Sequence, residues 1–145
     1  MVIGGLLVPE LLLKVLDGGR WPRTSNEASK QNLHSMVSKE RLQKLAPEES
    51  HLYLYPPPFH TVSQIMTGPG ADFYSRFGAV TDLIPQMVIE IGDFGLGSDA
   101  PILLDYRDNL SVPRVIRLLW PGDGVPNRWV IMAPDFHAFI KVLGL

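Results

Sequence analysis

Residues 87–132 decide the fold, and they read MVIEIGDFGLGSDAPILLDYRDNLSVPRVIRLLWPGDGVPNRWVIM. Four short runs in this stretch are rich in apolar and β-branched residues, and turn-forming residues separate them. We expect these runs to be strands, at Met87–Ile91, Ile102–Tyr106, Val115–Trp120 and Arg128–Met132. Four strands joined by short turns predict an antiparallel meander.

Helices are predicted before and after these strands in the sequence. Apolar spacing after a first-turn proline predicts a helix over Val8–Asp17, and a second helix can begin at a Ser38 cap and end at Pro47. After Pro134 a closing helix is predicted, with an apolar face made of Phe136, Phe139, Ile140 and Leu143. Leading helices, a run of strands and a final helix indicate the α+β class.

The segments between are less regular. Arg23–Asn32 has almost no large apolar residue, so we expect a surface loop there. His51–Tyr55 is β-prone and is followed by three prolines, which predicts a strand at an edge of the sheet and a place where a homodimer could pair. Phe59–Met66 and Ala71–Phe77 are predicted to form helical turns.

Length and composition fit one domain over residues 1–145, of ordinary globular character. The 13 glycines and 13 prolines favour short elements joined by structured loops. With no cysteine, disulfides, thiolate catalysis and cysteine-based zinc sites are excluded. The apolar start of the chain resembles neither a signal peptide nor a membrane anchor, and we expect a cytoplasmic protein.

The net charge of −2 is unevenly spread along the chain. Residues 1–46 carry seven basic and four acidic side chains, residues 47–108 carry two and nine, and residues 109–145 carry four and two. The acidic middle disfavours nucleic acid as a ligand, because that affinity comes largely from neutralised phosphates. It suits a basic protein partner instead.

Candidate catalytic motifs lack their required context. The Asp-Phe-Gly of a kinase occurs at residues 93–95, but without the other kinase signatures, and the Gly-rich stretch 92–99 lacks the Lys-Ser/Thr of a phosphate loop. We interpret that stretch as a hairpin loop. Asp93, Asp99 and Asp105 are expected to cap turns or to pair with Arg107 or Arg117, and no metal site is predicted.

Three tryptophans, Trp21, Trp120 and Trp129, lie near turns. We expect each to belong to the core or its edge, as most large aromatic residues do. A tryptophan at a rim could also anchor a partner, so Trp120 is kept as a candidate binding residue.

Residues 91–107, IGDFGLGSDAPILLDYR, resemble the signature region of the SUKH superfamily, which includes the Smi/Knr type of cell-wall regulators and many bacterial immunity proteins. The resemblance continues through residues 113–120 and 127–130 and the closing helix. It covers about residues 87–143 and is looser over 8–59. The candidate signature or partner-binding residues are Asp93, Phe94, Gly95, Gly97, Ser98, Asp99, Asp105, Tyr106, Arg107, Asp108 and Trp120.

The resemblance implies an α+β domain with a curved antiparallel sheet packed by helices, without enzyme activity or cofactor. In bacteria such proteins bind and neutralise polymorphic or contact-dependent toxins, often nucleases, and this short chain fits the bacterial type better. The alternative that the resemblance leaves open is a regulatory scaffold of the Smi/Knr type that binds other proteins.

Three hypotheses follow. The first is an immunity protein whose acidic surface, drawn from Asp93, Asp99, Asp105 and Asp108, covers a basic toxin domain. The second is the general scaffold. The third is a hydrolase or metal-dependent enzyme that uses the aspartates and His60, for which no recognisable constellation is present.

Overall fold

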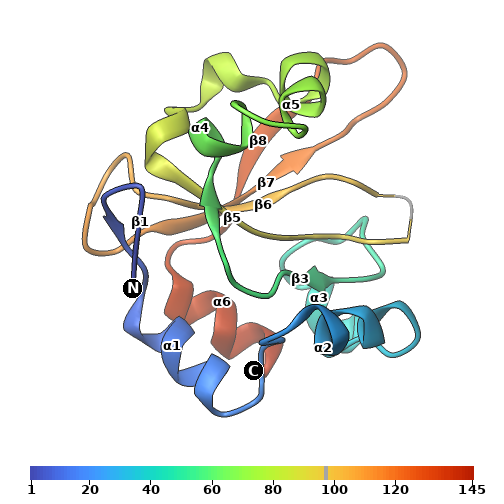
Figure 1. Cartoon of the computed structure of the whole chain (residues 1–145). Helices are drawn as coiled ribbons and strands as arrows, with labels where there is room; N and C mark the ends of the chain where they lie inside the picture. The colour runs from blue at the N-terminus through green and yellow to red at the C-terminus, as the bar shows by residue number, and fades with distance from the viewer. Residues whose placement is uncertain (97) are drawn as a thin grey trace.

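The computed structural model describes residues 1–96 and 98–145 and confirms the α+β fold with a curved antiparallel sheet. The meander is formed by consecutive neighbours, β5 (Val88–Asp93), β6 (Ile102–Asp105), β7 (Arg114–Leu119) and β8 (Arg128–Ala133). Two short strands, β3 (Tyr53–Leu54) and β4 (His60–Thr61), pair with the other side of β5. The predicted order of the four meander strands is therefore correct, with different strand ends, whereas β4 lies in a stretch predicted as a helical turn (Figure 1).

The remaining elements lie before, between and after the strands of the sheet along the chain. The helices are α1 (Glu10–Asp17), α2 (Ser25–Ser29), α3 (Lys39–Leu42), α4 (Val62–Ile65), α5 (Ala71–Phe77) and α6 (Phe136–Leu143). Short 3₁₀ turns occur at Lys30–Asn32, Val80–Asp82 and Pro85–Met87. A hairpin that the sequence did not predict opens the chain, with strands β1 (Val2–Ile3) and β2 (Leu6–Leu7).

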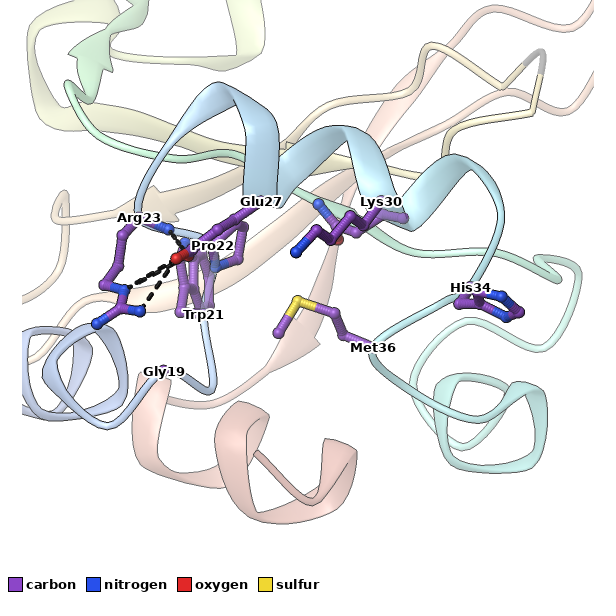
Figure 2. Close-up of a pocket in the computed structure, with 9 residues that line it drawn as sticks. Gly19, Trp21, Pro22, Arg23, Glu27, Lys30, His34 and Met36 are labelled. Carbon is purple, nitrogen blue, oxygen red and sulfur yellow. Dashed lines mark hydrogen bonds and ion pairs between the residues drawn. The ribbon is translucent and has the colours of Figure 1, made fainter.

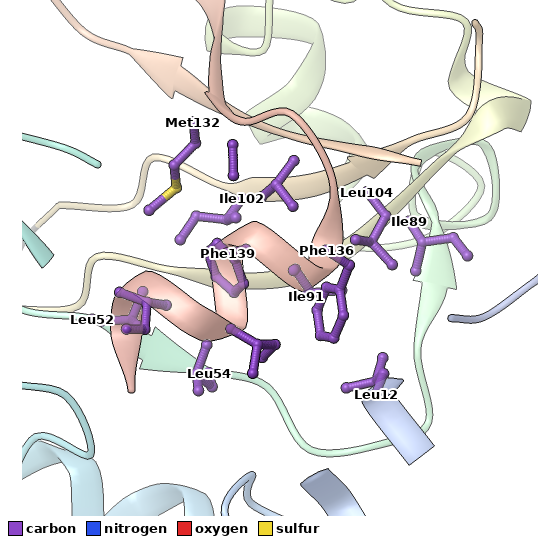
Figure 3. Packing of buried hydrophobic residues seen from close by; sticks show 14 of the residues in the cluster. Leu12, Leu52, Leu54, Ile89, Ile91, Ile102, Leu104, Met132, Phe136 and Phe139 are labelled. Carbon is purple, nitrogen blue, oxygen red and sulfur yellow. The ribbon is translucent and has the colours of Figure 1, made fainter. Parts of the chain in front are cut away.

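The sheet is covered on both faces (Figure 1). On one face α1 and α6 pack over Ile89, Ile91, Ile102 and Leu104, and the rings of Phe136 and Phe139 point into this core (Figure 3). On the other face α4 and α5 pack over a smaller cluster that contains Val62, Tyr74, Val88, Leu103 and Ile116. In the part of the chain that the structure describes, no helix is long and apolar enough to cross a membrane.

The closing helix forms as its sequence predicts. The Asp135 carboxylate accepts a hydrogen bond from the backbone N–H of Ala138 at 2.7 Å, which caps the first turn. Gly144 ends the helix in the left-handed conformation that glycine adopts without strain. All four residues of the predicted apolar face are buried: Phe136, Phe139, Ile140 and Leu143.

The prediction of a loop over Arg23–Asn32 is wrong. Thr24 caps α2 by accepting a hydrogen bond from the N–H of Glu27, so a polar sequence forms a helix. Gln31 is buried, and its amide both donates to the carbonyl of Leu54 and accepts from the N–H of Leu54, at 2.9 and 2.8 Å. This side chain occupies the backbone groups of β3 that a second copy of the chain would need.

The three tryptophans differ in exposure to solvent. Trp21 is completely buried, and its indole donates to the carbonyl of Tyr55 at 2.8 Å. Trp129 is half-buried, and its indole donates to the carbonyl of Gly78. Trp120 is 46% exposed and packs against Phe73, which itself packs on the core, so it belongs to the edge of the core rather than to the core itself. It follows the last residue of β7, at the turn that leaves the sheet.

Candidate functional site

A register shift in β5 brings two carboxylates together. Alternation along a strand would place Glu90 and Asp93 on opposite faces, since three positions separate them. The pairing of β5 with β6 shifts between Glu90 and Gly92, which inserts one residue and reverses the alternation after it. Both carboxyl groups consequently line one cavity of about 200 Å³ on the α5 side of the sheet.

Two tyrosines hold these carboxylates. The hydroxyl of Tyr74, on α5, donates to Glu90. The hydroxyl of Tyr55 donates to the Asp93 carboxylate at 2.7 Å, and the other oxygen of Asp93 accepts from the N–H of Gly95 at 2.8 Å. These bonds connect β5 with α5, with the segment after β3 and with the β5–β6 loop.

Burial raises the pKa of both carboxyl groups. It raises the pKa of Glu90, and the nearby Asp93 raises it further, while the hydrogen bond from Tyr74 opposes both effects. Burial likewise raises the pKa of Asp93, against the hydrogen bonds from Tyr55 and Gly95. It also raises the pKa of both tyrosines, which remain hydrogen-bond donors at neutral pH.

A raised pKa in the folded state makes stability depend on pH. The stabilising contribution of a protonated Glu90 is complete below the ordinary pKa of 4.5 and is lost as the pH rises through the raised value. We therefore expect Glu90→Gln, neutral at every pH and still able to accept from Tyr74, to be more stable than the native chain at pH 7. The urea midpoints of the two proteins should converge below pH 4.5.

The matched control is Glu40→Gln, because Glu40 is exposed on α3. Its urea midpoint should stay with that of the native chain at both pH values. A Glu90→Gln protein that is less stable than the native chain at pH 7 would contradict this account of the pair.

Two glycines of the stretch that resembles the signature, Gly92 and Gly95, have structural roles. A Cβ on Gly92 would lie 2.6 Å from the carbonyl oxygen of Tyr53, so only glycine lets β3 approach β5 this closely. Gly95 has a φ of +52°, and a Cβ there would lie 2.8 Å from the ring of His51. Phe94, between them, is 1% exposed and therefore belongs to the core.

The tip of the β5–β6 loop presents an apolar side chain within an acidic surrounding. Leu96 is 74% exposed and has a φ of +43°, a strained conformation for leucine. Ser98 contacts Glu49 at 3.4 Å, and burial together with the neighbouring Glu48 raises the pKa of Glu49. Arg117 forms an ion pair with Glu48.

Five carboxylates thus gather at one end of the sheet, which we call the acidic end: Glu48, Glu49, Glu90, Asp93 and Asp99. Trp120 lies at this end as well, because β5 and β7 run in the same direction and both finish there. Its ring packs on Phe77 and Phe73, with centroids 5.3 and 6.3 Å away, and Phe73 also lines the cavity of Glu90 and Asp93. The β5–β6 and β7–β8 loops lie on the same side of the molecule (Figure 1).

The predicted acidic surface from Asp93, Asp99, Asp105 and Asp108 is wrong. Asp105 pairs with Val88 at the start of β5, so it and Asp108 lie at the opposite end of the sheet from Asp93. The side chain of Asp105 is fully buried. Its carboxylate contacts four groups: Nε and Nη2 of Arg114, both at 2.9 Å, Nε of Arg107 at 3.6 Å and the backbone N–H of Arg107 at 3.1 Å. The predicted ion pair with Arg107 is confirmed, and Arg114 is the nearer partner.

The other predicted residues at that end also have structural partners. Tyr106 is buried, and its hydroxyl donates to the carbonyl of Leu7 in β2. Arg107 donates to the carbonyl of Asp82, and Asp108 pairs with Arg114 at 3.3 Å. The prediction for Gly97 falls outside the described residues.

The sequence interpretation missed Glu48, Glu49, Glu90, Tyr55 and Tyr74. The one available signal was Glu90 itself, a charged residue within an otherwise apolar strand. His60 stands opposite Glu90 in β4, but it is exposed and lines a neighbouring hollow of about 240 Å³. Within residues 1–96 and 98–145, no three acidic or histidine side chains come together as metal ligands would.

A second cavity, of about 260 Å³, lies beside α2 (Figure 2). Arg23, Lys30 and His34 line it, but Glu27 holds the Arg23 guanidinium in an ion pair at 3.0 Å. This cavity mixes both signs of charge, so the acidic end is the stronger candidate for a charged partner. Comparisons with protein-family models, curated proteins and solved structures gave no match to this chain.

Proposed function

We propose that this chain is a non-enzymatic protein-binding domain of the SUKH type, an immunity protein that neutralises a toxin by docking it on the acidic end. The observation that carries the proposal is the combination found there: several carboxylates and two exposed apolar side chains, Leu96 and Trp120, lie at the same end of the sheet. The sequence resemblance over residues 87–143 supports the choice of family and of partner.

The chemistry of this surface suits a basic domain such as a nuclease. A nuclease needs positive charge to hold phosphates, and an acidic inhibitor gains fast, salt-sensitive association with such a surface. A few well-packed side chains, most often Trp, Tyr or Arg, carry most of the binding energy of an interface when the contacts around them exclude water. Leu96 and Trp120 would be the anchors, and Asp99 and Glu48 part of the rim.

The test is capture of a partner from cells that produce the candidate toxin, with two variants compared. Leu96→Asp and Leu110→Asp change leucines of similar exposure, 74% and 64%, at opposite ends of the sheet. We expect the native chain and Leu110→Asp to retain one basic chain at low salt, and Leu96→Asp to lose it. A single lost anchor weakens binding by about 30-fold.

Two results would contradict the proposal. If Leu96→Asp captured the basic chain as well as Leu110→Asp, the acidic end would not be the docking surface. If abundant housekeeping proteins were recovered without any toxin-like chain, the Smi/Knr type of scaffold would be the better function.

A further inference from the structure

The strand β8 forms an open edge of the sheet. It pairs with β7 on one side, and within residues 1–96 and 98–145 no other strand pairs with it. It is six residues long and contains no proline, and Arg128 is its only charged residue. Ile131, near its centre, is 60% exposed. Natural proteins usually protect such an edge with charge, proline, a β-bulge or a covering element. The pairing of β8 with β7 shifts register once, between Ile131 and Ala133, and is regular from Arg128 to Ile131.

The backbone groups that face outward can be identified from the ladder. The N–H of Leu118 donates to the carbonyl of Pro101 on the β6 side, and the groups of an antiparallel strand alternate between its two neighbours. Arg117 and Leu119 therefore bond toward β8, where their partners are Val130 and Arg128. Trp129 and Ile131 consequently direct their N–H and C=O groups away from β7.

We propose that β8 pairs antiparallel with β8 of a second copy of this chain, so that two sheets join across a two-fold axis at Val130. In this register Val130 lies opposite Val130 of the second copy, and each Trp129 lies opposite Ile131 of the second copy. The outward N–H and C=O groups of Trp129 and Ile131 can then bond to each other. An aromatic residue opposite a β-branched one is a favourable cross-strand pair. Ile131 lies opposite Ile116, on the α5 face of the sheet, and would become covered.

The charges of the edge allow this pairing. Arg128 would lie opposite Met132 of the second copy, so the two arginines stand four residues apart along the strands, about 13 Å. This exceeds the Debye length of about 8 Å at physiological salt. The two-fold axis also reverses the strand direction, so the two acidic ends lie far apart and stay open.

The edge at Leu52–Tyr55, where the sequence placed a possible dimer contact, is a weaker candidate. Its paired strand β3 has two residues, and the Gln31 amide bonds both backbone groups of Leu54. Among the described strands, β8 is therefore the longer and less protected edge of the six-stranded sheet.

The first test is the mass in solution by sedimentation over a range of concentrations. We expect twice the chain mass of 16.1 kDa for the native protein and for Leu110→Lys, and one chain mass for Ile131→Lys. A lysine at position 131 places a charge on the strand edge and so disfavours pairing with a second copy. Because the side chain of Ile131 is exposed, the substitution should leave the fold intact, which circular dichroism would check. A native protein that stays monomeric at every concentration, or a dimer that Ile131→Lys leaves unchanged, would overturn the proposal.

The second test fixes the register and uses the absence of cysteine in the native chain. Residues in a non-hydrogen-bonded antiparallel pair have Cα atoms about 4.5 Å apart, within reach of a disulfide. Val130→Cys should therefore give a cross-linked dimer on mild oxidation, while Ile131→Cys and Leu110→Cys should not. A dimer in which Val130→Cys fails to cross-link would overturn the proposed pairing.

Discussion

Replacing Asp105 by alanine is expected to lower the free energy of unfolding by about 3 kcal/mol. The carboxylate is fully buried, and one of its oxygens accepts from Nε and Nη2 of Arg114, both at 2.9 Å. Its other oxygen accepts from the N–H of Arg107. Alanine would leave the Arg114 guanidinium, most of which is buried, without its closest partner.

Asp108→Ala is the matched control, because Asp108 pairs with the same Arg114 from an exposed position. Exposed ion pairs contribute roughly 0–1 kcal/mol, so this variant should unfold almost as the native chain does. The measurement is the midpoint of urea unfolding with an unchanged slope. Equal effects of the two substitutions would show that burial of Asp105 does not set its contribution.

Replacing Phe139 by alanine is expected to cost about 3–5 kcal/mol of stability. The ring is completely buried between α6 and the sheet and packs against Phe136 with centroids 5.8 Å apart. Its removal takes apolar surface from the core and leaves a cavity that the sheet cannot fill. This substitution tests whether α6 closes the larger core.

The control on the same helix is His137→Ala, because His137 is exposed. This change should alter the urea midpoint by less than about 0.5 kcal/mol in stability. If Phe139→Ala and His137→Ala had similar midpoints, the packing of α6 on the sheet would be contradicted.

The elements that the sequence predicted well are those whose pattern is local. The four strands of the meander and the apolar face of α6 follow from residue spacing, and both are confirmed. The polar α2 was missed although Thr24 and Glu27 have the spacing of a helix start, because the segment lacks an apolar face. The contact between the Gln31 amide and Leu54 bridges 23 positions of the chain. No pattern within either segment reveals that contact.

The candidate site was predictable only in part, for the same reason. Asp93 and Asp99 were named from the sequence, but their partnership with Glu90 depends on a register shift against β6. Asp105 is close to them in sequence, yet the length of β6 carries it to the other end of the sheet. The conspicuous residues of the resemblance are mostly structural, since Phe94, Asp105 and Tyr106 are buried.

Docking of a basic protein on the acidic end is tested by the association rate of the captured partner at several salt concentrations, for the native chain, Asp99→Lys and Asp108→Lys. Both aspartates are exposed, and they lie at opposite ends of the sheet. We expect Asp99→Lys to slow association at least about tenfold at low salt and to flatten the salt dependence, and Asp108→Lys to change neither. Equal rates and equal salt dependence for the two variants would contradict docking on the acidic end.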